Sequence, residues 1–317
     1  MEHAVSAGLD LGFDDAQQAI SDAVASFCRD RCTEAIVRAA ANEFPLALWR
    51  DLASLGVLAI ATQEGDGGAV EIVAAMEPLG RALHPGPLAE TYFAMQLLSA
   101  AERVRVAAGE AIVAVGTPPL LPWAPIAQLF VEVDGYAAWL GEPRGAIEAV
   151  AVLGGEPWGR ATLVRRTALG ATARAHALGN LALAAYLAAA GRRLIEAAAE
   201  HARARRQFGR AIASFQAVAH PLADCVIALD AAATLARVAA WEWDAEEPSA
   251  PMRSAAARLS ASRAAERSAH AAHQVFGALG VMRDGPVFYA SRRILQLVAS
   301  PPGTSPARTT LLASLGL

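Results

Sequence analysis

Apolar residues recur near helical spacing at the start of the chain, with charged residues between them. This pattern covers residues 14–40 and predicts an amphipathic helix there. Its apolar positions are Ile20, Val24, Phe27 and Ile36. Pro45 opens a second predicted helix that ends at Gly56, and the apolar residues on one face of it are Leu46, Leu48, Leu52 and Leu55.

The residue pattern changes between Ile112 and Arg165, where short apolar runs are separated by Pro, Gly and Asp. Runs of this length between turn residues are typical of β-strands. The predicted strands lie at residues 112–115, 129–133, 147–153 and 162–164. A small β domain is therefore expected in the middle of the chain.

Long helical patterns return after this domain. Residues 170–204 are rich in alanine and contain no proline, and the apolar pattern continues from Gln216 to Trp243. Pro248 ends that pattern, a new helix is expected from Ser249 to about Phe276, and a shorter one near Pro286. Four helices with apolar faces and short connections predict a bundle.

The glycine-rich run from Gln63 to Gly68 cannot sustain a helix and predicts a loop. Such loops bind phosphate in some proteins, but the acidic residues Glu64 and Asp66 argue against that reading here.

Composition narrows the choice of function. The chain has 317 residues, 55% of them hydrophobic and 18% charged, with a net charge of −4. This fits a compact soluble protein without a large positive field, so nucleic acid is a poor candidate for a partner. All 27 basic residues are arginines, which excludes Schiff-base chemistry and a P-loop lysine.

Three scattered cysteines, Cys28, Cys32 and Cys225, suggest neither a disulfide framework nor a zinc site. No metal site is expected. The sequence shows no signal-peptide pattern and no apolar stretch of membrane-spanning length, so a cytoplasmic protein that does not enter a membrane is expected.

Two segments carry candidate chemistry. In Arg205-Arg206-Gln207-Phe208-Gly209 an always-protonated guanidinium stands beside an amide and an aromatic ring, just before a helix that begins near Gln216. Arg205 could pair two phosphate oxygens at once, while Phe208 could pack on a planar ring. The alternative is that the arginines form a solvated helix end and Phe208 fills the core. The second segment runs from Gln274 through Gly277 and Ala278 to Gly280.

Together the two segments resemble the paired turns with which acyl-CoA dehydrogenases contact flavin adenine dinucleotide (FAD). The resemblance covers nearly the whole chain. It implies a mainly α protein with a small central β domain: an N-terminal helical domain (1–110), a reduced β domain (111–168) and a C-terminal four-helix bundle (169–317). It also implies that FAD is shared across a subunit interface. The implied contacts are Arg205, Gln207, Phe208, Gln216, Gln274, Gly277 and Ala278, the last standing where the family commonly has glycine.

The resemblance is incomplete where the family needs its catalytic glutamate. Pro302 stands at the commoner position and Gly179 at the alternative one. Glu196 and Glu200 lie on the same predicted helix as Gly179 but several turns later, where pairing with Arg192 and Arg203 is expected. The strands that hold the flavin ring in the family are not recognisable between Ile112 and Leu169, so the chain's own flavin and acyl pocket is expected to be absent or collapsed.

These features resemble the shorter, base-lacking subunit of heteromeric (α2β2) bacterial steroid-CoA dehydrogenases. The implied role is a non-catalytic, flavin-contacting subunit that helps a catalytic partner to desaturate a bulky, steroid-derived acyl-CoA, with electron-transfer flavoprotein as acceptor. Two alternatives stay open. One is a self-sufficient homo-oligomeric dehydrogenase whose base is another carboxylate, such as Glu242 or Glu266. The other is a scaffold subunit without cofactor contact.

Overall fold

The N-terminal part of the chain is a cluster of helices. The computed structural model describes residues 11–62, 65–135, 137–300 and 304–316. The helices are α1 (Asp15–Arg31), α2 (Glu34–Ala39), α3 (Leu46–Ser54), α4 (Ala69–Ala82), α5 (Leu88–Met95) and α6 (Ala100–Ala107). The single helix predicted over residues 14–40 is thus two, because the chain turns at Cys32 and the Thr33 side chain caps α2.

The predicted helix after Pro45 is confirmed, and it ends at Ser54, two residues before the predicted end at Gly56. It begins after Pro45, and Gly56 adopts a left-handed conformation (φ 78°) just after its end. Leu48 and Leu52 are buried in the core, whereas Leu46 and Leu55 are exposed.

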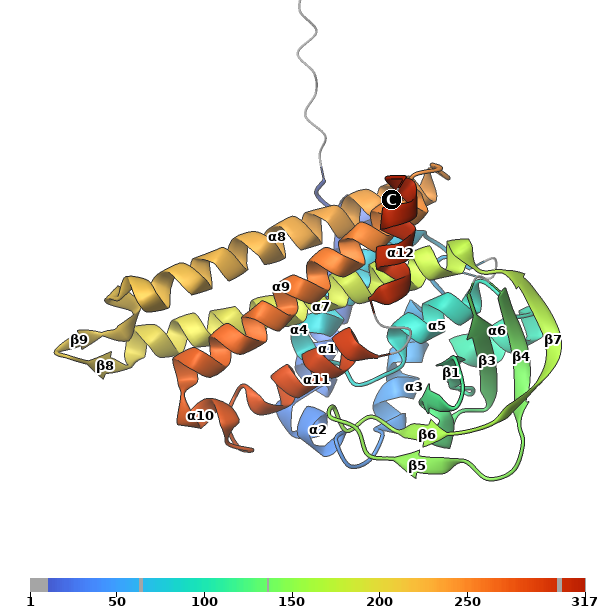
Figure 1. Ribbon diagram of the computed structural model, residues 1–317, viewed down its shortest axis with the longest axis horizontal. Coiled ribbons are helices and arrows are strands. Elements are labelled where there is room, and N and C mark those ends of the chain that lie inside the picture. Colours follow the sequence, from blue (N-terminus) through green and yellow to red (C-terminus); the bar gives the residue numbers. More distant parts are fainter. Residues whose placement is uncertain (1–10, 63–64, 136, 301–303, 317) are drawn as a thin grey trace, which may run out of the picture.

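Two small sheets follow, as the strand pattern predicted (Figure 1). In one, β1 (Val113–Gly116) pairs in parallel with β3 (Leu129–Asp134), which pairs antiparallel with β4 (Ala137–Pro143) and through it with β7 (Leu163–Ala171). In the other, β6 (Trp158–Arg160) lies between β2 (Leu120–Pro122) and β5 (Glu148–Val150). β2, β4 and β6 were not predicted, because their sequences contain Pro, Gly or Trp and lack an alternation of aliphatic residues.

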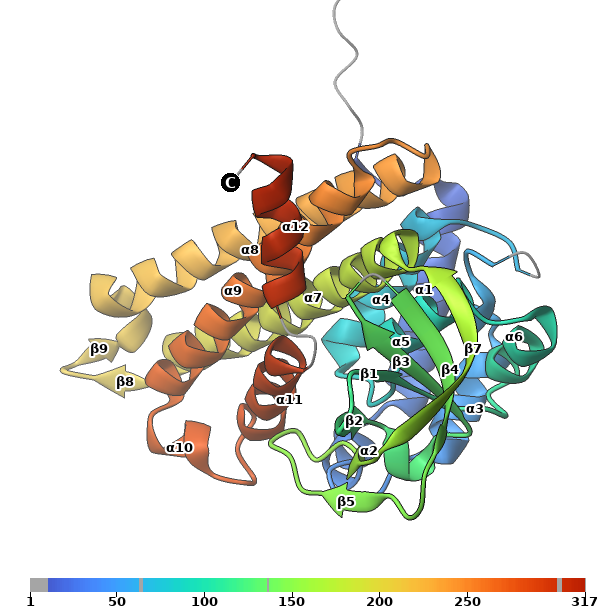
Figure 2. The same cartoon turned by 45° about the vertical axis from the view of Figure 1, so that its right-hand side comes forward.

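Three long helices form the body of the C-terminal part: α7 (Ala173–Ala204), α8 (Gln216–Asp244) and α9 (Ala250–Phe276). Figures 1 and 2 show them running lengthwise from the sheets to the opposite end of the molecule. Gly191 permits their close packing, since a Cβ there would lie 2.7 Å from Leu229 and 3.2 Å from the Cα of Ala265. Short helices complete this part, namely α10 (Ala278–Val281), α11 (Phe288–Ala299) and α12 (Ser305–Ser314). No helix in the described part of the chain is long and apolar enough to span a membrane.

The N-terminal helices are joined to the bundle through α4, which packs on α7 and α8. The Asp244 carboxylate at the end of α8 accepts hydrogen bonds from the first two backbone amides of α4, at 2.7 and 3.0 Å. Gly68 lets it approach, because a Cβ there would lie 2.2 Å from Asp244 Oδ1. The anion at this helix N-terminus is therefore the protein's own carboxylate, which agrees with the rejection of a phosphate loop here.

Candidate functional site

The segment after α7 folds into a hairpin at the end of the bundle away from the sheets (Figures 1 and 2). Its strands are β8 (Arg206–Gln207) and β9 (Arg210–Ala211). Phe208 and Gly209 form the turn with φ of 51° and 81°, the two positive values that a tight hairpin turn requires. The Phe208 side chain is 92% exposed, so the reading in which it fills the core is wrong. A left-handed backbone conformation at a non-glycine residue, together with an aromatic ring exposed to solvent, costs free energy. Such backbone strain is concentrated at functional sites.

Arg205 ends α7 and is fixed by its backbone. Its N–H donates to the carbonyl of His201 and its carbonyl accepts from Ile212, both at 2.8 Å. Its exposed guanidinium makes no ion pair with any residue that the structure describes. Arg206 donates to the carbonyl of Gly209 (3.1 Å), and Arg210 lies over the Phe215 ring. The hairpin therefore presents an unpaired cation beside an exposed ring.

The start of α8 adds a second feature suited to an anion. Gln216 is its first residue, no side chain caps this end, and its first turn holds no acidic residue. The free amide groups and the positive end of the dipole of this 29-residue helix favour a phosphate group nearby.

The second predicted turn lies beside the first at the same end of the bundle. His201, near the end of α7, stacks on Phe276, at the end of α9, with ring centroids 4.4 Å apart. Gly277 follows with φ 57°, and a Cβ added there would meet nothing within 4 Å. Gln274, Gly277 and Ala278 are all exposed. The structure thus places all seven predicted contact residues on one exposed end of the molecule. An arginine, amides, a ring and a helix N-terminus there fit an FAD pyrophosphate and its ring system. None of the described residues covers this end.

A separate cavity of about 110 Å³ lies between α5, α7 and the β1–β3 edge. Gly179, the alternative position of the family base, lies in its wall, and a Cβ there would touch Phe93 Cβ and the Ala89 carbonyl at 3.4 Å. Ser300, which follows α11, lines it too. Pro302 lies outside the described residues. An interior cavity is therefore present beside Gly179, and position 179 supplies it with no carboxylate.

The cavity does contain a carboxylate that the motif comparison missed. Glu90 on α5 lines the cavity and is half-buried. Burial raises the pKa of its carboxyl group, whereas a hydrogen bond from Trp123 lowers it. A sequence signal existed: Glu90 is the only Asp, Glu, Lys or Arg between Arg81 and Glu102. Glu242 and Glu266, the carboxylates considered as alternative bases, do not line the cavity. Glu242 is instead bonded to Ser249 and Arg253, each at 3.0 Å.

One wall of the cavity is formed by a buried polar cluster around Arg293 of α11. Its guanidinium donates to the Tyr186 hydroxyl (2.6 Å), Glu156 Oε1 (2.8 Å) and the His84 carbonyl (2.9 Å). Both side chains of the Arg293–Glu156 pair are at most 7% exposed. This cluster ties α11 to α7 and to the loops after α4 and β5.

The imidazole of His84 is fully buried beside this cluster, and neither ring nitrogen has a hydrogen-bond partner among the described residues. Burial, reinforced by the Arg293 charge, lowers its pKa from 6.5 to about 3. The folded state thus keeps His84 neutral while the unfolded state protonates it below about pH 6.5, so stability falls as the pH drops from 6.5 toward 3.

Replacing His84 by leucine is expected to flatten this acid dependence. Between pH 6.5 and 5.0 the unfolding free energy of wild type should fall by roughly 1.6 kcal/mol through His84, with a slope that grows toward about 1.4 kcal/mol per pH unit. Urea unfolding at the two pH values measures it, with the exposed His220→Leu as control. An H84L protein as acid-sensitive as wild type would contradict this account.

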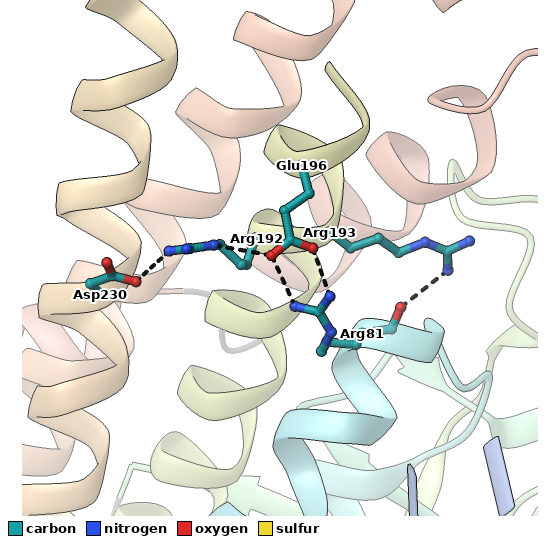
Figure 3. A network of polar contacts seen from close by, with 5 residues as sticks. All are labelled: Arg81, Arg192, Arg193, Glu196 and Asp230. Carbon is teal, nitrogen blue, oxygen red and sulfur yellow. Dashed lines mark hydrogen bonds and ion pairs between the residues drawn. The ribbon is translucent and has the colours of Figure 1, made fainter. Parts of the chain in front are cut away.

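Glu196 belongs to the surface rather than to a site. Figure 3 shows it between Arg81 of α4 (2.6 Å) and Arg192 (3.2 Å), which also reaches Asp230 of α8 (2.6 Å). Arg193 donates to the carbonyl of Arg81 (3.1 Å). The expected ion pair between Glu196 and Arg192 is present, and the second partner of Glu196 is Arg81 rather than Arg203. The network connects α4, α7 and α8.

Comparison with known proteins identifies the fold. Residues 14–111 match the acyl-CoA dehydrogenase N-terminal domain and residues 169–313 its C-terminal domain. The chain is 30% identical over 308 residues to acyl-CoA dehydrogenase IpdE2 of Mycobacterium tuberculosis, covering 90% of this chain and 93% of that protein. Among solved structures, the ChsE4-ChsE5 complex of Mycobacterium tuberculosis aligns with a TM-score of 0.81 and 25% identity, over 97% of this chain and 99% of that one.

The Tcur3481-Tcur3483 steroid acyl-CoA dehydrogenase, a G363A variant, aligns with the same TM-score and coverage at 23% identity and shares the fold. The matched domains, the full-length relative and the order of helical, β and helical parts agree. The chain belongs to the acyl-CoA dehydrogenase family.

Proposed function

We propose that this chain is the non-catalytic, flavin-contacting subunit of a heteromeric acyl-CoA dehydrogenase. The observation that carries the proposal is the division of the site. The residues predicted to contact flavin lie on an exposed end that no described residue covers, while the separate cavity has glycine at position 179. An exposed, anion-binding end that requires a facing surface fits a second chain. Two of the solved structures that share this fold, ChsE4-ChsE5 and Tcur3481-Tcur3483, are each named for two different chains, which supports a partner subunit.

Each predicted contact then has a role in the complex. Arg205 would pair pyrophosphate oxygens, Gln207 and Gln274 would donate and accept beside it, and Phe208 would pack on a ring of the dinucleotide. The N-terminus of α8 at Gln216 would face the phosphates, and Gly277 and Ala278 would line the second turn. Bound FAD supplies the hydride acceptor of the reaction.

The partner would supply the glutamate that removes the α proton of the acyl-CoA. We propose a bulky, steroid-derived acyl group, since one of the related structures is described as a steroid dehydrogenase. Electron-transfer flavoprotein is the proposed electron acceptor, and the cytoplasm the proposed compartment.

Co-expression tests this role. Expressed alone, the chain should be colourless and inactive; with the gene product encoded beside it, it should form a yellow α2β2 complex by native mass and desaturate steroid-CoA esters. A colourless co-expressed complex would contradict the proposal. Faster oxidation of short straight-chain acyl-CoAs than of steroid ones would contradict the proposed substrate.

A second candidate function is favoured by Glu90, which places a carboxyl group with a raised pKa in the cavity. In that case the chain is a self-sufficient homo-oligomeric dehydrogenase with Glu90 as its base. The chain expressed alone would then be yellow, would bleach when an acyl-CoA is added, and would lose bleaching in Glu90→Gln. These outcomes separate the two functions.

A further inference from the structure

The cavity has a charged residue that no ion pair of the described residues neutralises. Arg258 of α9 lines it and is 3% exposed. Its guanidinium donates only to neutral acceptors, Ser262 Oγ at 2.8 Å and the Leu297 carbonyl at 3.0 Å. Burial lowers the pKa of Arg258 to about 10. A buried charge paired only with neutral groups is costly, and a bound anion would offset that cost.

The other cation of the cavity wall is already paired. Arg293 is bonded to Glu156, so its charge is compensated. Glu90 is the remaining carboxyl group among the described wall residues. Its charge raises the pKa of Arg258 and so partly opposes the effect of burial, but the two side chains form no ion pair at contact distance. Burial raises the pKa of Glu90, which makes its carboxyl group a weaker competitor for the Arg258 charge than a solvent-exposed carboxylate would be.

The remaining surface is mainly aliphatic and aromatic, with Met76, Phe93 and Leu183 among its members. A cavity of about 150 Å³ accommodates benzene, so a volume near 110 Å³ fits an acyl chain of about four carbons. An apolar chamber of this size with one unpaired guanidinium matches a small amphiphile with a single negative charge.

We propose that this cavity binds a free short-chain carboxylate, whose carboxylate group pairs with Arg258 and whose alkyl chain fills the apolar part. A CoA thioester would not satisfy Arg258 in the same way, because its acyl carbonyl carries no charge. This binding would not depend on the chain's role as a flavin-contacting subunit.

Ligand-observed NMR titration of the full chain tests the proposal, with its partner subunit present if the two co-purify. Butyrate should bind at least tenfold more tightly than butyramide, which has nearly the same shape and no charge. Arg258→Met should weaken butyrate binding at least tenfold, whereas Arg263→Met, an exposed arginine on the same helix, should leave it unchanged.

Equal binding of butyrate and butyramide to wild type would overturn the proposal, as would undiminished butyrate binding in R258M. If R258M does not fold, the comparison of the two ligands on wild type decides alone. Flavin content and oligomeric state are read on the same samples, so failure here leaves the subunit role to be judged separately.

Discussion

Replacing Arg293 by methionine is expected to lower the free energy of unfolding by about 3–5 kcal/mol, because it leaves the buried Glu156 carboxylate without its partner. Methionine keeps much of the volume, so the loss reflects the charge and its hydrogen bonds. Tyr186 and the His84 carbonyl lose a donor in the same step. Since α11 is held to α7 through this cluster, the change should also loosen the segment that leads to Ser300.

Urea unfolding of R293M and wild type at pH 7.5 measures the effect. Arg81→Met is the matched control: it breaks the Glu196 pair, whose side chains are about half exposed, and should cost less than about 1 kcal/mol. Adding Glu156→Gln to R293M should recover part of the loss by removing the stranded charge. A loss below about 1 kcal/mol in R293M would show that the cluster does not stabilise the fold as described.

The long helices could be predicted well from the sequence because local rules fix their ends. Gln216 and Phe276 were placed correctly because the apolar period begins at Gln216 and stops at Phe276, where Gly277 follows. The break at Cys32 escaped because Thr33 caps a new helix without interrupting the apolar spacing. Helix caps made by distant residues are invisible in the same way, and Asp244 at the start of α4 is an example.

The two turns predicted to contact flavin could be proposed from the sequence because each is a short, contiguous motif. Their exposure could not, since Phe208 in such a motif is equally compatible with a buried ring. Only the positive φ of Phe208 and its 92% exposure distinguish the two.

The cavity residues were the hardest to predict because tertiary packing assembles them. Glu90, Arg258 and Arg293 come from α5, α9 and α11, far apart in the chain. Arg258 in particular sits among alanines and serines in a helix whose sequence gives no sign that this arginine is buried. Motif comparison identified Gly179 and Pro302 as the positions where the family's carboxylate is missing. It could not find the charged residues that line the cavity, because they belong to no motif.

Replacing Arg205 by alanine is expected to weaken flavin binding by the co-expressed complex roughly ten- to hundredfold. A charge-assisted hydrogen bond contributes about 1.5–3 kcal/mol, and the Arg205 side chain is exposed without an ion pair among the described residues, so its removal should cost the fold little. Subunit association and the melting temperature of the flavin-free complex should stay close to wild type. Arg105→Ala, which removes an exposed arginine of α6 near the other end of the molecule, is the matched control.

The dissociation constant of FAD for these complexes, measured by flavin fluorescence after removal and stepwise return of the cofactor, tests the central claim most directly. If this subunit completes a partner's flavin site, R205A binds FAD at least tenfold more weakly than wild type while R105A is unchanged. Equal affinities of R205A and wild type in an intact complex would contradict the claim and leave this chain as a scaffold with the fold of a dehydrogenase.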